Sequence, residues 1–251
     1  MNFQNKIWGK HPVCEAVKSA KRGLEIIFFS KEAKGGIVDE IKKIAKERDI
    51  DFVYKDKGFF YNFGRNHQGV AALLRDAEKE SIVTIEDILE ETKKKNKPAF
   101  MLLLDSITDP HNLGAILRTA EAAGVDGIII PKHRACGLTS TVSKTSAGAV
   151  EHVLIVEVTN LSQEIERLKS ENIWVVGLDT GAEKSIYEMD LEMPLAVVIG
   201  SEGEGLRKLV KEKCDFLAHL PMNGKINSLN ASVAAGICLY EVVRQRGESK
   251  K

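Results

Sequence analysis

The chain has 251 residues, 43% of them hydrophobic and 29% charged, which is typical of a globular protein large enough for one big domain or two smaller ones. No apolar run approaches the roughly 18 residues that cross a bilayer, and the first residues contain no signal-peptide core, so we expect no membrane segment and a cytoplasmic location. The net charge is zero, but residues 1–76 carry 15 lysines and arginines against 10 acidic residues, whereas residues 98–251 carry 16 against 20. This uneven distribution of charge indicates that residues 1–76 would hold a nucleic acid. An excess of basic residues of this size is, however, also common on solvated surfaces.

Residues 1–76 alternate helical and strand patterns and are predicted to form a small α/β domain. Its predicted elements are a helix at 13–20, a strand at 26–29, a helix at 36–48 and strands at 51–54 and 70–74. Residues 77–97 differ in character, because one amphipathic helix lies between runs of charged residues, and are predicted to be a linker.

Residues 98–251 alternate strands and helices and are predicted to form a second, larger α/β domain. The predicted strands lie at 100–104, 127–130, 153–156, 173–177, 195–199 and 216–220. The predicted helices lie at 112–123, 141–149, 161–168, 206–213 and 231–246. Strands this apolar, without polar alternation, are typical of a parallel sheet that helices cover on both faces.

Three segments of the second domain join the end of a predicted strand to the start of a predicted helix. In the first of them, Asp109 can cap a helix whose opening turn accepts Pro110, because a missing N–H costs nothing there. Asn112 and Arg118 lie off the apolar stripe of that helix, so they face either solvent or a ligand. A surface salt bridge is the alternative role for Arg118.

The second segment runs from Ile199 to Leu206 and has glycines at positions 200, 203 and 205. Glycine permits close backbone approach and positive φ, so this turn can present N–H groups to a ligand. The spacing differs from the Gly-x-Gly-x-x-Gly fingerprint, which argues against a nucleotide-dependent dehydrogenase. Glu202 is either a ligand-facing carboxylate or a helix-start carboxylate.

The third segment runs from Asn227 to Ala234 and begins a helix rich in small residues. Local capping explains one or two of the polar residues Asn227, Ser228 and Asn230, but not all three. All three segments follow strands of one predicted sheet. We therefore expect a ligand site beyond the carboxyl ends of those strands.

Together the three segments resemble the motifs of the SpoU/TrmH branch of the SPOUT RNA methyltransferases. The residues that carry this likeness are Asn112-x5-Arg118, Gly200-Ser201-Glu202-Gly203 and Asn227-Ser228-Leu229-Asn230-Ala231-Ser232-Val233-Ala234. The likeness covers residues 98–251, where the stretch from Arg134 to Gly148 also fits, apart from Ser140 in place of a frequent proline. Through Gly9-x-His11-Pro12-Val13 and His67-Gln68-Gly69-Val70 it extends to that branch's substrate-binding domain, which is related in fold to ribosomal protein L30e.

The resemblance implies methylation of a ribose 2′-hydroxyl in RNA, with S-adenosylmethionine bound inside a deep trefoil knot of the last third of the chain. Within the family the chain is most similar to bacterial enzymes that methylate a guanosine of 23S ribosomal RNA. Ribose methyltransferases of transfer RNA share the same motifs and remain an alternative. The resemblance also implies a homodimer with its sites at the interface.

The resemblance assigns two groups of residues. Gly200, Leu220 and Leu229 would line the adenosine pocket through their backbones, and Asn112, Arg118, Glu202, Ser228 and Asn230 would form the reactive site. A guanidinium normally stays protonated, so Arg118 is expected to hold a phosphate and stabilise the developing alkoxide rather than act as a base. The other four would position the ribose and Arg118.

Other chemistry-bearing residues give weaker signals. The four cysteines form no Cys-x-x-Cys pair and are predicted to be reduced thiols, and the six histidines show no metal-ligand spacing, so we expect no metal site. Lys132-His133-Arg134 and Arg207-Lys208-x-x-Lys211 are either phosphate contacts or solvated surface. A non-catalytic RNA-binding protein is the alternative of a different class, and it would have no affinity for S-adenosylmethionine.

Overall fold

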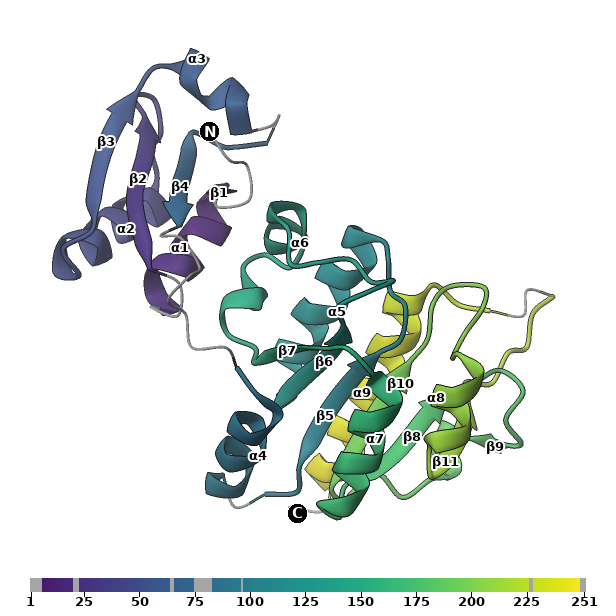
Figure 1. Ribbon diagram of the computed structural model, residues 1–251. Coiled ribbons are helices and arrows are strands. Elements are labelled where there is room, and N and C mark those ends of the chain that lie inside the picture. The colour runs from purple at the N-terminus through teal and green to yellow at the C-terminus, as the bar shows by residue number, and fades with distance from the viewer. Residues whose placement is uncertain are drawn as a thin grey trace. The chain divides into compact units, whose positions relative to one another are not determined.

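The computed structural model describes residues 6–19, 23–63, 66–74, 83–95, 97–225 and 228–248 (Figure 1). The chain divides into two compact units by its contacts. Unit 1 comprises residues 1–81 and 138–152, and unit 2 comprises residues 82–137 and 153–251.

Unit 1 contains a four-stranded sheet in the order β1-β4-β2-β3, in which only β2 and β3 are parallel. The strands are β1 (Lys6–Trp8), β2 (Leu24–Ser30), β3 (Asp51–Lys55) and β4 (Val70–Leu74). The helices are α1 (Lys10–Ser19), α2 (Gly36–Glu47), α3 (Lys57–Phe60) and α6 (Ser140–Thr145), with the 3₁₀ turns η2 (Tyr61–Phe63) and η4 (Ala149–Glu151). Helix α2 buries Val38, Ile41 and Ala45 at helical spacing, as its apolar stripe predicts.

Residues 138–152 belong to unit 1 although they lie far along the chain. Nε2 of His152 lies 2.7 Å from Oε2 of Glu15 on α1. Gly148 has φ +90°, and a Cβ there would lie 2.7 Å from the Cβ of Glu15. A glycine is therefore required where this segment crosses α1.

Unit 2 contains a seven-stranded sheet in the order β7-β6-β5-β10-β8-β11-β9, and every strand pair in it is parallel. The strands are β5 (Phe100–Leu104), β6 (Gly127–Pro131), β7 (Ile155–Val158), β8 (Trp174–Leu178), β9 (Lys184–Ser185), β10 (Leu195–Ile199) and β11 (Phe216–His219). The helices are α4 (Ile85–Lys94), α5 (Pro110–Ala122), α7 (Leu161–Ser170), α8 (Lys208–Lys213) and α9 (Ala231–Glu248), with the 3₁₀ turn η5 (Ile186–Glu188). The predicted α/β fold with a parallel sheet is confirmed.

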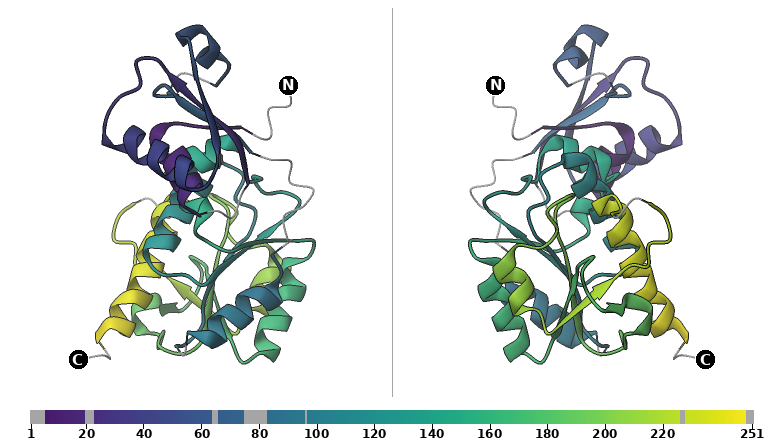
Figure 2. Two further views of the ribbon diagram at one scale, coloured as in Figure 1. Left: turned by 90° about the vertical axis from the view of Figure 1, so that its left-hand side faces the viewer. Right: turned by 90° about the vertical axis from the view of Figure 1, so that its right-hand side faces the viewer.

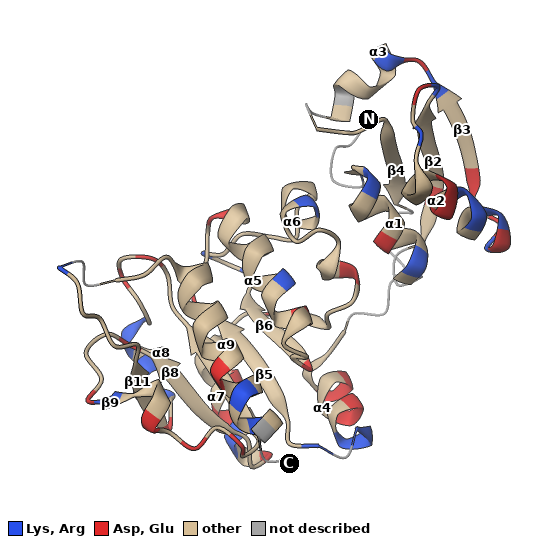
Figure 3. Ribbon diagram, turned by 180° about the vertical axis from the view of Figure 1, so that it is seen from behind, with Lys and Arg blue, Asp and Glu red and all other residues tan. Residues whose placement is uncertain are grey.

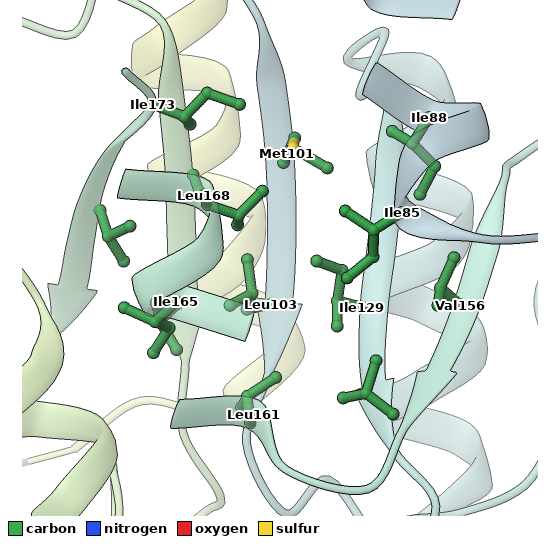
Figure 4. Close-up of a cluster of buried hydrophobic side chains, with 14 of the residues drawn as sticks. Ile85, Ile88, Met101, Leu103, Ile129, Val156, Leu161, Ile165, Leu168 and Ile173 are labelled. Atoms are coloured by element: carbon green, nitrogen blue, oxygen red, sulfur yellow. The ribbon is translucent and has the colours of Figure 1, made fainter. Parts of the chain in front are cut away.

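Helices cover both faces of this sheet, as the apolar strands predict. In the edge-on views of Figure 2, α9 and α5 lie on one side of the strands and α4, α7 and α8 on the other. The close-up in Figure 4 shows the second side, where Met101 and Leu103 of β5 belong to one buried cluster with Ile165 and Leu168 of α7. Figure 3 shows that β5 and β6 carry no charged residue, since both strands are buried along their full length.

Several predicted boundaries are wrong, for identifiable reasons. The helix predicted at 141–149 ends at Thr145, because Ala147 and Gly148 adopt positive φ. The helix predicted from 206 begins at Lys208, because Gly205 has positive φ and Arg207 is extended. The strand predicted at 153–156 is Ile155–Val158, the residues that pair with β6. The short elements β1, α3 and β9 were not predicted, since two to four residues give no periodicity.

Candidate functional site

Unit 2 has a cavity of about 330 Å³ at the carboxyl ends of β8, β10 and β11. Its walls come from the loops after those three strands and from the start of α9. The lining residues are Leu178, Asp179, Thr180, Ile199, Gly200, Ser201, Glu202, Gly203, Glu204, Gly205, Leu220, Met222, Ser228, Leu229, Ala231 and Ala234. This is the position where open α/β sheets bind ligands, and the volume is in the range of small-molecule sites.

The glycine-rich loop after β10 forms one wall of the cavity. Ser201 and Gly205 exchange backbone hydrogen bonds, with N···O distances of 3.1 and 3.0 Å, and Gly203 and Gly205 have φ of +91° and +68°. A Cβ on Gly200 would lie 2.2 Å from the backbone carbon of Gly205. The two ends of the loop therefore approach so closely that only glycine fits at position 200.

Three of the predicted reactive residues meet at the mouth of the cavity. Nδ2 of Asn230 donates to Oδ1 of Asn112 at 2.9 Å and lies 3.3 Å from Oε2 of Glu202. Nδ2 of Asn112 lies 3.4 Å from the same Glu202 oxygen. Residues separated by 118 and 90 positions in the sequence thus form one polar cluster, which we call the Asn–Glu–Asn cluster (Asn112, Glu202 and Asn230).

Helix caps hold two members of this cluster in place. The carboxylate of Asp109 accepts from the backbone N–H groups of His111 and Asn112, which fixes the first turn of α5. Oδ1 of Asn230 accepts from the N–H groups of Ser232 and Val233 at the start of α9. Asn230 therefore caps its helix with its oxygen, and its Nδ2 points to the cluster.

Arg118 does not join the cluster within one chain. It lies on α5 six residues after Asn112, about 9 Å further along the helix axis and on a different side of it. Its side chain is exposed, does not line the cavity and has no hydrogen bond or ion pair within the described part of the chain.

The remaining predicted residues lie at the cavity. Gly200, Leu220, Leu229 and Ser228 all line it. Asn227 lies outside the described residues. In the described ranges, no group of three histidine, cysteine, aspartate or glutamate side chains could hold a metal ion.

Two carboxylates that the sequence analysis missed hold the cavity walls. Asp105, fully buried at the end of β5, accepts from the backbone N and from Nε of Arg207 at 2.8 and 2.6 Å. Asp179 accepts from Nζ of Lys211 and from the N–H of Gly181, both at 2.9 Å. Each aspartate directly follows an apolar strand, and this was the available signal.

The cavity suits a nucleoside-sized ligand that backbone groups recognise. Apolar walls from Ile199, Leu220 and Leu229 can cover a flat base. The carboxylates of Glu202 and Glu204, which form no ion pair within the described residues, give the cavity an acidic rim, which suits a ligand that carries positive charge. The residues present therefore fit a cationic nucleoside such as the cofactor that the resemblance implies.

Comparisons with known proteins agree with this geometry. Residues 99–240 match the SpoU rRNA Methylase family, and residues 6–80 match the family described as RNA 2′-O ribose methyltransferase substrate binding. The chain is 46% identical over 239 residues, 95% of its length, to YacO of Bacillus subtilis strain 168, which is named as a TrmH family tRNA/rRNA methyltransferase and is covered to 94%.

Solved structures show the same fold over nearly the whole chain. The SpoU methyltransferase AviRb from Streptomyces viridochromogenes, solved in complex with AdoMet, has a TM-score of 0.81 at 22% identity, with 97% of this chain and 90% of that one covered. A crystal structure of an RNA 2′-O ribose methyltransferase has a TM-score of 0.78 at 26% identity, with 96% and 88% covered. Together with the fold, the family match and the similarity to YacO define an α/β RNA-modifying enzyme. More specifically, the chain belongs to the SpoU/TrmH family of RNA methyltransferases.

Proposed function

We propose that the protein transfers a methyl group from S-adenosylmethionine to a ribose 2′-hydroxyl in RNA. One observation supports this most directly: the Asn–Glu–Asn cluster lies at the mouth of the cavity, and Glu202 belongs to both. A ligand in the cavity and a second substrate at the cluster would therefore have adjoining reactive atoms. Holding two reactants in line can lower a barrier by roughly 7–11 kcal/mol.

The backbones of Gly200, Leu220 and Leu229 would hold the cofactor in the cavity. When bound, the cofactor supplies a methyl group already activated by its positively charged sulfur. The protein's own task is to orient the ribose and to stabilise the 2′-oxygen as it becomes anionic. Asn112 and Asn230 carry the amide donors suited to positioning the ribose hydroxyls, and Glu202 holds both amides by hydrogen bonds. The trefoil knot that the resemblance implies remains part of this proposal.

Arg118 would complete the site from the partner subunit of a homodimer. On α9 the large apolar side chains Val233, Tyr240 and Val243 are 49%, 51% and 36% exposed and lie on one side of the helix. Helix α5 packs beside α9, and a Cβ on Gly236 would lie 3.8 Å from Cγ2 of Thr119, next to Arg118. Two-fold contact through this face would bury the apolar side chains and bring Arg118 of the partner subunit toward the cluster.

A guanosine of 23S ribosomal RNA is the proposed target, with a transfer-RNA ribose as the alternative. The match of residues 6–80 to a dedicated substrate-binding family favours ribosomal RNA, because a separate domain suits a large folded substrate. Such a substrate would also place the enzyme in the cytoplasm.

Calorimetric titration and a methylation map test the proposal. The purified protein is expected to bind S-adenosylhomocysteine and not NAD, which would exclude both the dehydrogenase and the non-catalytic RNA-binding protein. RNA from a strain lacking the gene should miss one 2′-O-methyl group, and the purified enzyme should restore it in vitro. Failure to bind S-adenosylhomocysteine would refute the proposed activity, and a missing methyl group in transfer RNA would refute the ribosomal target.

Mixing two inactive variants tests the shared site. Arg118→Ala and Asn230→Asp should each lose methyl transfer, and a mixture that exchanges subunits should regain part of it, because one of its two sites contains both native residues. Arg118→Lys should stay inactive if the bidentate guanidinium is required. No recovery in a mixture shown to contain heterodimers would mean that Arg118 acts within its own chain.

A further inference from the structure

The turn that follows β6 carries three consecutive cationic or titratable residues at the same edge of the sheet as the cavity. We call Lys132, His133 and Arg134 the basic turn. All three side chains are exposed, whereas Pro131 before them is buried at the end of β6. The turn is held by its backbone, since the N–H of Lys132 donates to the carbonyl of Val158 at 2.8 Å.

The basic turn lies beside the loop that leads into α5. The N–H of Cys136 donates to the carbonyl of Ile107 at 2.8 Å, which ties the end of the turn to that loop. Asp109 follows Ile107 by two residues in the same loop. Asp109 in turn binds the N–H of Asn112. A short series of contacts therefore joins the basic turn to the Asn–Glu–Asn cluster.

The charged side chains of the basic turn are not paired with other described residues. Within the described residues, Lys132, His133 and Arg134 have no hydrogen bond or ion pair through their side chains. The other basic cluster of the sequence differs in this respect, because Arg207 is bound to Asp105 and Lys211 to Asp179. Of the two clusters that the sequence offered as phosphate contacts, the structure thus leaves the basic turn available for a ligand.

The backbone of the basic turn is strained in a way that favours a functional role. Arg134 has φ +58°, in the left-handed region where glycine and asparagine are the usual residues. A non-glycine residue there has an energetic cost, and among the described residues the Arg134 side chain makes no hydrogen bond or ion pair that would offset it. Residues held in such conformations cluster at binding and active sites.

We propose that the basic turn binds RNA backbone phosphates next to the target nucleotide, with Arg134 as the bidentate contact and Lys132 as a second point charge. This inference rests on the proposed function and adds to it a substrate contact made by the catalytic unit itself. The proposed ligand is a phosphodiester group, whose negative charge complements the basic turn. The position of the turn would set the distance between this phosphate and the cavity.

Two substitutions test the proposal against a matched control. Arg134→Gly removes the side chain and suits the left-handed backbone, and Lys132→Gln removes one charge. Lys213→Gln also removes one charge, but Lys213 lies just before β11, at the opposite edge of the sheet, where it pairs with Glu166 at 2.8 Å. Binding of ribosomal RNA from the deletion strain is measured by filter retention at several salt concentrations, and S-adenosylhomocysteine binding by calorimetry.

The expected results distinguish a role of the basic turn in RNA binding from a role in the stability of the protein. Arg134→Gly should weaken RNA binding about tenfold and Lys132→Gln about threefold, and each should reduce the salt slope by about one unit, because one phosphate contact is lost. The melting temperature of Arg134→Gly should stay the same or rise, since strain is relieved. Affinity for S-adenosylhomocysteine should change less than twofold in every variant, and Lys213→Gln should bind RNA like the wild type.

Two outcomes would overturn the inference. One is unchanged RNA affinity and salt slope in Arg134→Gly. The other is a lower melting temperature together with weaker S-adenosylhomocysteine binding, which would make the turn structural. Failure of the proposed function would instead show in the wild type, as absence of S-adenosylhomocysteine binding or methyl transfer, while RNA binding by the variants can still be compared.

Discussion

The two edges of the seven-stranded sheet use the same polar residue types for different purposes. At the amino edge, Arg246 donates to the carbonyls of Pro98, Ala99, Leu191 and Met193 and lies 5.1 Å from the ring centre of Phe100. Buried Asp126 there accepts from the N–H of Phe100, and Asp215 accepts from the N–H of Val175.

At the carboxyl edge, Asp105 is likewise bound to a backbone N–H, but other polar side chains bind one another or, in the described part of the chain, have no side-chain partner. The members of the Asn–Glu–Asn cluster join each other through side chains, and the basic turn has no side-chain partner among the described residues. The difference shows that residue type alone does not separate structural from functional groups. Hydrogen bonds are more informative, because a donor or acceptor atom already bound to buried backbone is not available to a ligand.

The largest expected effect is at the amino edge. Arg246→Ala leaves the carbonyls of Pro98, Ala99, Leu191 and Met193 without this donor and should lower the free energy of unfolding by about 3 kcal/mol, measured in urea. Lys132→Gln at the carboxyl edge is the control and should change it by less than about 0.5 kcal/mol. A tenfold loss of S-adenosylhomocysteine affinity in folded Arg246→Ala would contradict the idea that the amino edge serves stability and the carboxyl edge serves ligand binding.

Asn230→Asp should affect chemistry and spare stability. An aspartate keeps the oxygen that caps α9, but it removes the Nδ2 donor to Asn112 and places a second carboxylate beside Glu202. Single-turnover methyl transfer should fall about 100-fold, which corresponds to about 2.7 kcal/mol. S-adenosylhomocysteine affinity should stay within threefold of the wild type, and a loss of α9 helicity by circular dichroism would show that the cap was the main role.

Asp105→Asn should affect cofactor binding in particular, because Asp105 belongs to the carboxyl edge yet is fully buried. Asparagine can still accept the N–H of Arg207, but it loses the charge that holds Nε of that residue at 2.6 Å. The glycine-rich loop should loosen, and S-adenosylhomocysteine affinity should fall about tenfold, or about 1.4 kcal/mol by calorimetry. Unchanged affinity would mean that the loop keeps its shape without the ion pair.

The reactivity of two cysteine thiols, one at each edge of the sheet, gives the smallest expected effect. Burial raises the pKa of Cys214, just before β11 at the amino edge, to about 12, so at pH 8 its thiolate fraction is roughly a thousand-fold below that of an ordinary cysteine. Cys136 at the carboxyl edge, less deeply buried, should be alkylated at least tenfold faster, followed by mass spectrometry. The Cys214 rate should rise about tenfold per pH unit, because the pH stays far below its pKa. Equal rates would show that the amino edge opens as readily as the carboxyl edge.

The sequence alone determined the parallel sheet and pointed to the carboxyl edge where the cavity lies, because the signals are local. Uninterrupted apolar runs predict buried parallel strands, Asp109 and Pro110 start a helix, and glycines 200, 203 and 205 form a tight loop. Each of these features depends on residues that are neighbours in the chain, so periodicity and capping rules can predict it.

Only the tertiary structure decided which charged side chains are paired with other residues of the described chain and which are not. Asp105 and Arg207 are 102 residues apart, and no local pattern distinguishes Arg207, which is bound, from Arg134, whose side chain has no partner in the described ranges. The same holds for residues 138–152, which pack on α1 through Glu15 and His152, and for Arg118, whose direction follows from how α5 packs on α9. Contacts between distant segments form only when the whole chain folds, and they determine which side chains remain available for a substrate.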